Sequence, residues 1–250
     1  MTAITPSEDA LEADDGKVTD HRVRVAKMRR ERMRARLQAA ILHCCAVNHD
    51  HRPPSVEQVC KEADVSRVSF YKYFDSVHTA MESIGDSLLQ EMADSLKILL
   101  RDEPPLAHIV MGQALFLMRA ATDPIWGAFV SKVTRLNANA EFIRKIGGDL
   151  RAARDMGVID VADLDAAMSM ALASVFSGIG EIYNHGERHA EFCQNIIIMV
   201  LRGLGVDKER ATSLVAEVMA RIRVLAPGTL DWWPSAGDDA RAESVQAIAR

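Results

Sequence analysis

Five side chains with charged or hydroxyl groups stand close together between residues 66 and 74. They are Arg67, Ser69, Tyr71, Lys72 and Tyr73. Phe70 and Phe74 alternate with them and are four residues apart, which is the spacing of two apolar side chains on one face of a helix. We therefore expect the phenylalanines to face a core and the polar side chains to form an outward surface. A helix of this kind fits the major groove of DNA, where its N-terminal residues reach base edges.

Two short helices must position these side chains. Ser55 is placed to cap a helix over residues 55–63, and Ser66 is placed to cap a second helix over residues 66–74. Because helices this short are marginal in water when isolated, they must pack on each other and on flanking helices. The apolar positions between them allow such packing, and the pair predicts a helix-turn-helix.

The charge of the chain is unevenly distributed. The net charge is −5, which alone argues against binding to a polyanion. Residues 17–52, however, carry ten bases and three acids, whereas residues 1–16 carry five acids and no base. The location of charge matters more than its sum, so one end of the molecule can meet a polyanion. A solvated helix face is the alternative interpretation of the basic run.

The stretch from Ala63 to Phe74 resembles the recognition segment of the TetR (tetracycline-repressor) family of transcription regulators. It reads Ala-Asp-Val-Ser-Arg-Val-Ser-Phe-Tyr-Lys-Tyr-Phe in this chain. The usual form in the family is alanine, glycine, valine, serine, two variable positions, threonine or serine, a bulky apolar residue and then Tyr-x-Tyr/His-Phe. The preceding helix matches in spacing at Arg36, Ala39, Ala40 and Ile41. The resemblance in sequence covers about residues 30–80, and beyond it the chain resembles the family in helical layout alone.

The segment departs from the family pattern in three places. Asp64 replaces the usual turn glycine, but aspartate tolerates left-handed backbone better than most residues, so we expect the turn to survive. Residues 49–54 replace a turn that usually contains glycine. Val77 stands where the family often has a phosphate-contacting lysine, a loss that His78 or the basic arm can offset.

The resemblance implies a DNA-contacting role for most polar residues of the segment. Arg67 and Ser69 are implied to read base edges, since arginine can bind O6 and N7 of guanine together. The tyrosines and Lys72 are implied to contact phosphates, although burial in a core is the alternative for the tyrosines. Helix N-termini attract phosphate, and an arm over residues 22–36 is expected to track the backbone or enter the minor groove. The predicted DNA-binding residues are Ser55, Ser66, Arg67, Ser69, Tyr71, Lys72, Tyr73, His78, Arg29 and Arg30.

The rest of the chain keeps a helical pattern. After a first helix that ends near Val47, and after the two short ones, helices are predicted over residues 76–101, 106–121, 124–136, 139–155, 163–185, 189–204 and 208–225. We therefore predict an all-α protein with an N-terminal three-helix helix-turn-helix domain and a C-terminal helical ligand-binding and dimerisation domain. The expected division is a disordered acidic tail (1–20), the DNA-binding domain with its basic arm (21–78), the regulatory domain (79–225) and a C-terminal tail (226–250).

Aromatic and methionine side chains are frequent in the predicted regulatory domain. Most of them will belong to the core, but the family encloses an apolar cavity in this domain, so some are expected to bind a ligand. The predicted ligand-binding residues are Trp126, Phe129, Met168 and Phe176. The small residues of 163–185 and the apolar residues of 189–204 resemble the dimer interface of the family, a four-helix bundle. Burial inside one subunit is the alternative.

These patterns together imply a function. The resemblance implies a ligand-responsive repressor that binds a palindromic operator in double-stranded DNA as a homodimer, controlled by a small apolar effector. A DNA-binding protein without small-molecule control and a helical enzyme are the alternatives. Because the sequence has no phosphate-binding glycine loop, no GxSxG and no HExxH, we predict no enzyme and no cofactor.

The cysteines and the hydropathy pattern bear on metal binding and location. Cys44, Cys45, Cys60 and Cys193 lack the paired spacing of zinc ligands, so the histidines near 43–51 do not predict a metal site. Unpaired cysteines suit a reduced cytosol. The sequence has no uninterrupted run of about 18 apolar residues, so we expect no membrane span. We therefore expect a cytoplasmic protein.

Overall fold

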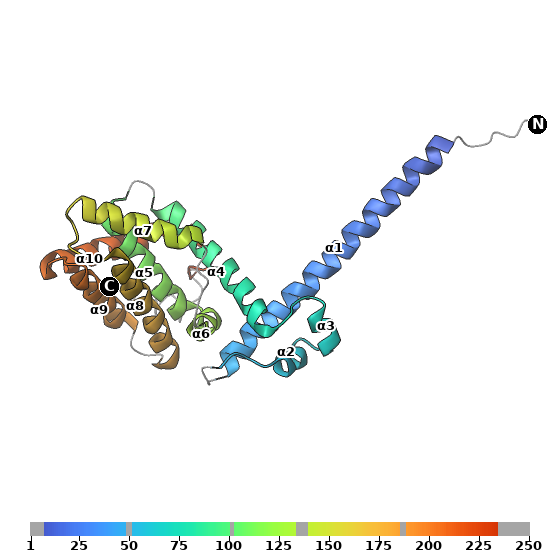
Figure 1. Cartoon of the computed structure of the whole chain (residues 1–250), viewed down its shortest axis with the longest axis horizontal. Helices are drawn as coiled ribbons and strands as arrows, with labels where there is room; N and C mark the ends of the chain where they lie inside the picture. The colour runs from blue at the N-terminus through green and yellow to red at the C-terminus, as the bar shows by residue number, and fades with distance from the viewer. Residues whose placement is uncertain (1–7, 49–51, 101–102, 134–139, 186–188, 235–250) are drawn as a thin grey trace, which may run out of the picture.

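The computed structural model describes residues 8–48, 52–100, 103–133, 140–185 and 189–234, and every regular element in these ranges is a helix (Figure 1). The helices are α1 (Glu8–Val47), α2 (Val56–Glu62), α3 (Arg67–Tyr71), α4 (Val77–Leu99), α5 (Pro105–Thr122), α6 (Pro124–Lys132), α7 (Ala140–Asp155), α8 (Leu164–His185), α9 (His189–Gly203) and α10 (Lys208–Leu225). This arrangement confirms the all-α prediction.

The N-terminal lobe consists of α2, α3 and the adjoining ends of α1 and α4. Neither short helix can form a core alone: α2 packs on α1, α3 packs on α2, and Ile41, Val59 and Phe70 are fully buried in the lobe. The rings of Phe70 and Phe74 lie 6.0 Å apart in that core, which confirms that the two phenylalanines face inward. The remainder of α1 projects as a long rod away from this lobe (Figure 1).

Helix α1 begins much earlier than the sequence pattern indicates. Its backbone is helical from Glu8, within the stretch 1–20 for which the sequence predicts a disordered tail, while residues 1–7 lie outside the described residues. The prediction was based on polarity and on the lack of apolar periodicity. Residues 8–20 are nonetheless rich in alanine and acids, which a helix accommodates, and acids are favourable near a helix N-terminus.

The C-terminal bundle is built around α5, with α4 and α6–α10 packed about it (Figure 1). Helix α5 is apolar on nearly all sides, as expected of a buried central helix. Local signals set the ends of its neighbours. Asp123 accepts a hydrogen bond from the Trp126 amide (3.0 Å) at the start of α6, and Gly157 and Gly205 adopt positive φ where α7 and α9 end.

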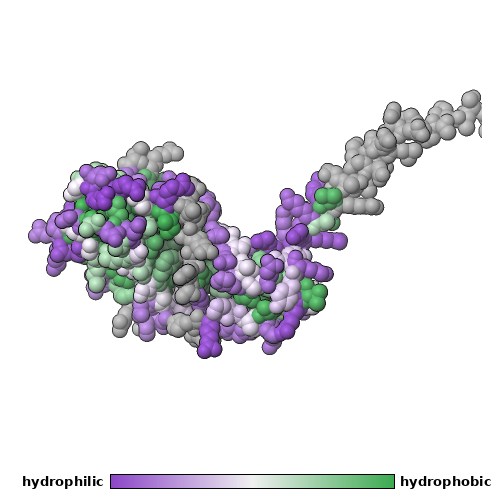
Figure 2. Space-filling view, in the orientation of Figure 1, coloured by the Kyte–Doolittle hydropathy of each residue, from purple (hydrophilic) through white to green (hydrophobic). Residues whose placement is uncertain are grey.

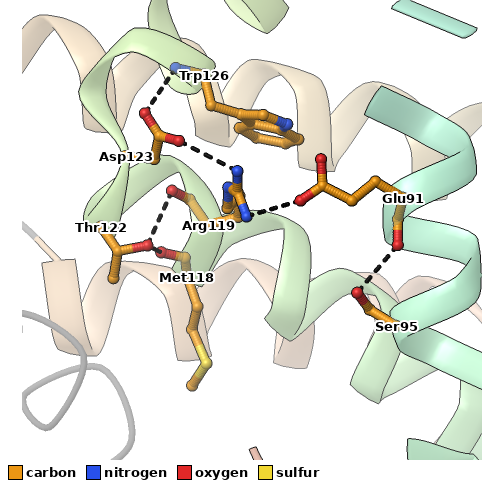
Figure 3. A network of polar contacts seen from close by, with 7 residues as sticks. All are labelled: Glu91, Ser95, Met118, Arg119, Thr122, Asp123 and Trp126. Atoms are coloured by element: carbon orange, nitrogen blue, oxygen red, sulfur yellow. Dashed lines mark hydrogen bonds and ion pairs between the residues drawn. The ribbon is translucent and has the colours of Figure 1, made fainter. Parts of the chain in front are cut away.

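The buried arginine Arg119 ties several helices of the bundle together (Figure 3). Its guanidinium donates to Glu91 of α4 at 3.1 Å and to Asp123 at the start of α6 at 3.2 Å. The same group lies 5.2 Å from the ring centroid of Trp232. Trp232 belongs to the predicted C-terminal tail, in which Leu230 is also buried, so the first part of that stretch packs on the bundle; residues 235–250 lie outside the described residues.

Candidate functional site

Helix α3 presents a continuous exposed surface. Arg67, Val68, Tyr71 and Lys72 are exposed, and Ser69 is half-buried beside them. Ser66 caps the helix by accepting from the Ser69 amide at 3.1 Å, and the two serine hydroxyls lie 3.0 Å apart. Of the residues that the sequence assigns to DNA contact, Ser66, Arg67, Ser69, Tyr71 and Lys72 are therefore brought together at α3, whereas Ser55, His78, Arg29 and Arg30 lie on or beside other helices.

Three of the predicted DNA-contacting residues also contact other parts of the protein. Arg67 forms an ion pair with Glu57 of α2, but its side chain is 60% exposed, and exposed pairs contribute only about 0–1 kcal/mol. The guanidinium can therefore exchange Glu57 for a nucleic-acid acceptor. Tyr71 is 54% exposed, whereas Tyr73 is half-buried and packs against the core. His78 lies 3.4 Å from Glu82 on α4.

Val68 is an exposed residue that the sequence analysis did not assign to the surface. It occupies one of the two variable positions of the segment and is 70% exposed, between Arg67 and Ser69. The helical spacing that buries Phe70 also turns position 68 outward, so the signal was present in the sequence. An exposed valine at this place can contact the methyl group of thymine in a major groove.

The turn between α2 and α3 has the left-handed backbone that the sequence required. Asp64 has a φ of 49°, which confirms that aspartate serves at the position of the usual glycine. Its carboxylate also lies 3.5 Å from the guanidinium of Arg36 on α1. At the start of α2, Ser55 and Gln58 cap each other reciprocally, so this helix begins where the sequence predicts.

The basic residues of α1 divide into two groups. Arg34 donates to Ser83 of α4 at 2.9 Å and lies 5.0 Å from the ring centroid of Phe74, so it helps to hold the lobe together. Arg29 and Arg30 are exposed and lie further along the projecting rod. The surface of the N-terminal lobe is predominantly hydrophilic (Figure 2).

A cavity of about 100 Å³ opens in the C-terminal bundle between α4, α5, α7 and α8. Its walls are mainly apolar. The lining residues are Gln90, Ala93, Leu96, Lys97, Leu100, His108, Ile109, Gly112, Gln113, Phe116, Lys145, Ile146, Asp149, Leu150, Ala171, Leu172, Val175 and Phe176. A mostly apolar, concave site with a few polar groups is the usual form of a small-molecule site.

Hydrogen bonds organise the polar groups of this cavity. Nδ1 of His108 lies 3.0 Å from Asp149 of α7, and Nε2 lies 3.2 Å from the carbonyl of Leu100 at the end of α4. The two contacts hold the imidazole ring between the end of α4 and α7. At the cavity edge, hydrogen bonds from Gln90 and Lys97 lower the pKa of Asp94.

One of the four predicted ligand-binding residues lines the cavity. Phe176 belongs to the wall, and Met168 lies outside it on the same helix. Trp126 and Phe129 are buried in the core, where the Trp126 ring meets Phe116 edge-on at 5.9 Å. Only Phe116 of that pair reaches the cavity. The sequence analysis missed Gln113, although a polar residue in the otherwise apolar centre of 105–122 was a visible signal.

A joint between the two lobes lies at the end of α1. The ammonium of Lys132, at the end of α6, is buried and donates to the carbonyls of Cys45 and Asn48. Tyr183 of α8 donates to the carbonyl of Ala46 at 3.1 Å. The final carbonyls of a helix lack partners within it and carry partial negative charge, so a buried cation is well placed there. Burial raises the pKa of the Cys45 thiol to about 11, opposed by the nearby Lys132.

Helices α8 and α9 leave part of their apolar surface uncovered. On α8, Ala166, Met170 and Ala173 are exposed, and on α9 Met199 is 72% exposed. Other small residues of α8 face inward instead, among them Ala171 and Gly178. The sequence left a dimer interface and burial inside one subunit open for these residues, and in the structure some are exposed and others are buried. Apolar side chains are visible on the surface of the bundle in Figure 2.

The structure describes some of the histidines and cysteines near 43–51 that resemble metal ligands. Nδ1 of His43 lies 3.0 Å from Glu62, and Cys44 and Cys45 are buried in the N-terminal lobe. His49 and His51 lie outside the described residues. Within the described part of the chain no group of three potential metal ligands comes together.

One helix passes a simple test for a membrane span. Within the described ranges, α8 alone is long and apolar enough to cross a membrane by composition. It packs against α5, α6 and α9 in the bundle.

The architecture matches solved structures along most of their length. RolR in complex with resorcinol covers 76% of this chain and 95% of its own, with 18% identity and a TM-score of 0.56. A γ-butyrolactone receptor (ArpA-like protein) covers 79% and 99%, with 15% identity and a TM-score of 0.52. A protein from Shewanella sp. PV-4 assigned to the TetR family of transcription regulators covers 69% and 97%, with 14% identity and a TM-score of 0.55. The chain has the TetR fold.

The TetR fold agrees with the resemblance carried by residues 63–74. No model of a protein family matches the chain, and neither does any curated protein. The likeness to the solved structures lies in the all-helical architecture.

Proposed function

We propose that this protein is a cytoplasmic, ligand-responsive repressor that binds a palindromic operator in DNA as a homodimer. The division of the chain into a DNA-binding domain over 21–78 and a regulatory domain over 79–225 is part of this proposal. Solved proteins of similar fold include a γ-butyrolactone receptor and a protein assigned to the TetR family of transcription regulators, and RolR was solved in complex with resorcinol. The effector proposed here is likewise a small, largely apolar molecule.

The single observation that carries the proposal is the course of α4. This helix starts at Val77, capped by Ser76, shortly after the exposed surface of α3, and its far half supplies Gln90 and Leu96 to the cavity wall. An occupant of the cavity therefore contacts the same rigid element that positions the recognition surface. A ligand shifts such an equilibrium only by its differential affinity for the two conformations, typically about 1–3 kcal/mol.

The exposed apolar faces of α8 and α9 support the homodimer. Small side chains such as Ala166 and Ala173 allow another helix to approach closely, and Met199 adds apolar area. Two helices from each subunit then make a four-helix interface with two-fold symmetry. In such a dimer we expect the two α3 surfaces to lie about one turn of DNA apart, roughly 34–36 Å, or a multiple of that distance.

Replacing single residues of α3 tests the recognition surface. On DNA selected by the wild-type protein, Arg67→Ala should cost about 1–3 kcal/mol and relax the preference at one base position, whereas Lys72→Ala should weaken all sequences alike and flatten the salt dependence by about one unit. The measurement is the Kd for the selected DNA and its single-base variants at several salt concentrations. Lys208→Ala, which removes an exposed base at the start of α10, is the control and should change neither quantity.

Equal losses from Arg67→Ala and Lys72→Ala on every sequence would remove Arg67 from base reading. The ion pair with Glu57 would then be its structural role.

A further inference from the structure

We propose that the effector carries a hydroxyl or N–H group and donates it to Oε1 of Gln113, with the rest of the molecule being apolar and about the size of one ring. This inference rests on the proposed function and names the chemical class of its ligand. It starts from a polar group that has no hydrogen-bond partner in the described part of the chain.

Gln113 is the unusual residue of α5. Its side chain is only 7% exposed, on a helix that is apolar nearly all round, and it lines the cavity. Its carboxamide oxygen has no hydrogen-bond partner among the residues that the structure describes. Proteins rarely leave a buried oxygen of this kind unpaired, because desolvation is not compensated. This oxygen has almost no accessible surface, so a bound donor reaches it when the carboxamide turns its oxygen toward the cavity, and it then supplies the missing hydrogen bond.

The other polar groups around the cavity differ from Gln113 because the structure gives them partners. His108 is held between Asp149 and the Leu100 carbonyl. Gln90 and Lys97 both donate to Asp94 at 3.0 Å. A ligand that competed for these groups would first have to break existing contacts, whereas a donor aimed at Gln113 breaks none.

Space for the apolar part of the ligand lies beside Gln113. A Cβ atom built on Gly112, the preceding residue and also part of the lining, would meet no heavy atom within 4 Å. Ile109, Phe116 and Phe176 provide apolar surface around this space. The site therefore combines one unpaired acceptor with an apolar slot, which suits a phenol or an alcohol and disfavours an ether of the same shape.

Two probes that differ only in the donor test this assignment. They are p-cresol and 4-methylanisole, which share the same methyl-substituted ring. The hydroxyl of p-cresol can donate a hydrogen bond, whereas the ether oxygen of 4-methylanisole cannot. Titration calorimetry on the full chain should show p-cresol binding about tenfold more tightly, which corresponds to about 1.4 kcal/mol. Gln113→Met keeps the length of the side chain and removes the acceptor, so it should bind the two probes equally.

The melting temperature of Gln113→Met separates a ligand role from a structural one. Since the oxygen has no partner among the described residues, its removal should leave the melting temperature unchanged or raised. A fall would assign Gln113 to folding and overturn the proposal. Equal binding of both probes by the wild-type protein, tighter binding of 4-methylanisole, or no binding of either probe would also overturn it. Failure of the proposed function would show differently, as unchanged DNA affinity at a saturating concentration of a bound probe.

Discussion

Lys132→Met is expected to lower the free energy of unfolding by about 2–4 kcal/mol, although methionine fills nearly the same space. The ammonium of Lys132 is the partner of two carbonyls at the end of α1, those of Cys45 and Asn48. Removing one partner of a buried hydrogen bond costs about 1–3 kcal/mol for each group left unsatisfied. Loss of the buried charge offsets part of this cost, because an ammonium is unfavourable in the interior.

The same change should loosen the connection between the two lobes. Lys132 lies 5.6 Å from the ring centroid of Tyr183, whose hydroxyl holds the Ala46 carbonyl. The joint thus links α1 to α6 and α8. Chemical denaturation gives the stability, and hydrogen exchange at the end of α1 reports on the joint itself. Lys208→Met removes an exposed lysine as a control; equal stabilities of the two variants would contradict the structural role of Lys132.

Gly112→Leu is expected to abolish the response to the effector while leaving DNA binding intact. The leucine side chain would occupy the open space beside Gln113 in the cavity. Because leucine is a better helix former than glycine by somewhat under 1 kcal/mol, α5 should not be weakened by the backbone change. Binding of an effector typically changes the affinity for a second ligand by about 5–150-fold, and in this variant the effector should no longer change the affinity for DNA.

The control for this variant is Gly148→Leu. Gly148 lies on α7, is exposed, and a Cβ atom built on it also meets no heavy atom within 4 Å. The measurement is the Kd for selected DNA with and without an effector retained on the purified protein. Gly112→Ala fills less of the cavity and should give an intermediate response. If Gly112→Leu responds to the effector as the wild-type protein does, the cavity is not the effector site.

The helices could be predicted from the sequence because their signals are local. Ser55, Ser66 and Ser76 cap the helices that they precede, and Pro124 stands at the first position of α6. The recognition surface was predictable for the same reason, since the positions of Phe70 and Phe74 determine which neighbours face outward. The start of α1 was not predicted, because an evenly polar helix has no apolar stripe.

The cavity could not be derived in the same way, because its walls come from four helices whose packing no local pattern encodes. Trp126 and Phe129 are aromatic residues of the kind that often line ligand sites, yet the packing of α6 places them in the core. The Lys132 joint spans 87 residues in the sequence and had no local signal. Gln113 was the exception, since a polar residue in the apolar centre of α5 is a signal that the sequence contains.

The most direct test of the central claim is selection of DNA from a random pool by the full-length protein, followed by footprinting and determination of the number of protomers bound. The proposed function predicts an inverted repeat whose half-sites are about one helical turn apart, or a multiple of it, with two protomers bound symmetrically through α3. Enrichment of no sequence, or protection of a single asymmetric half-site by one protomer, would contradict it.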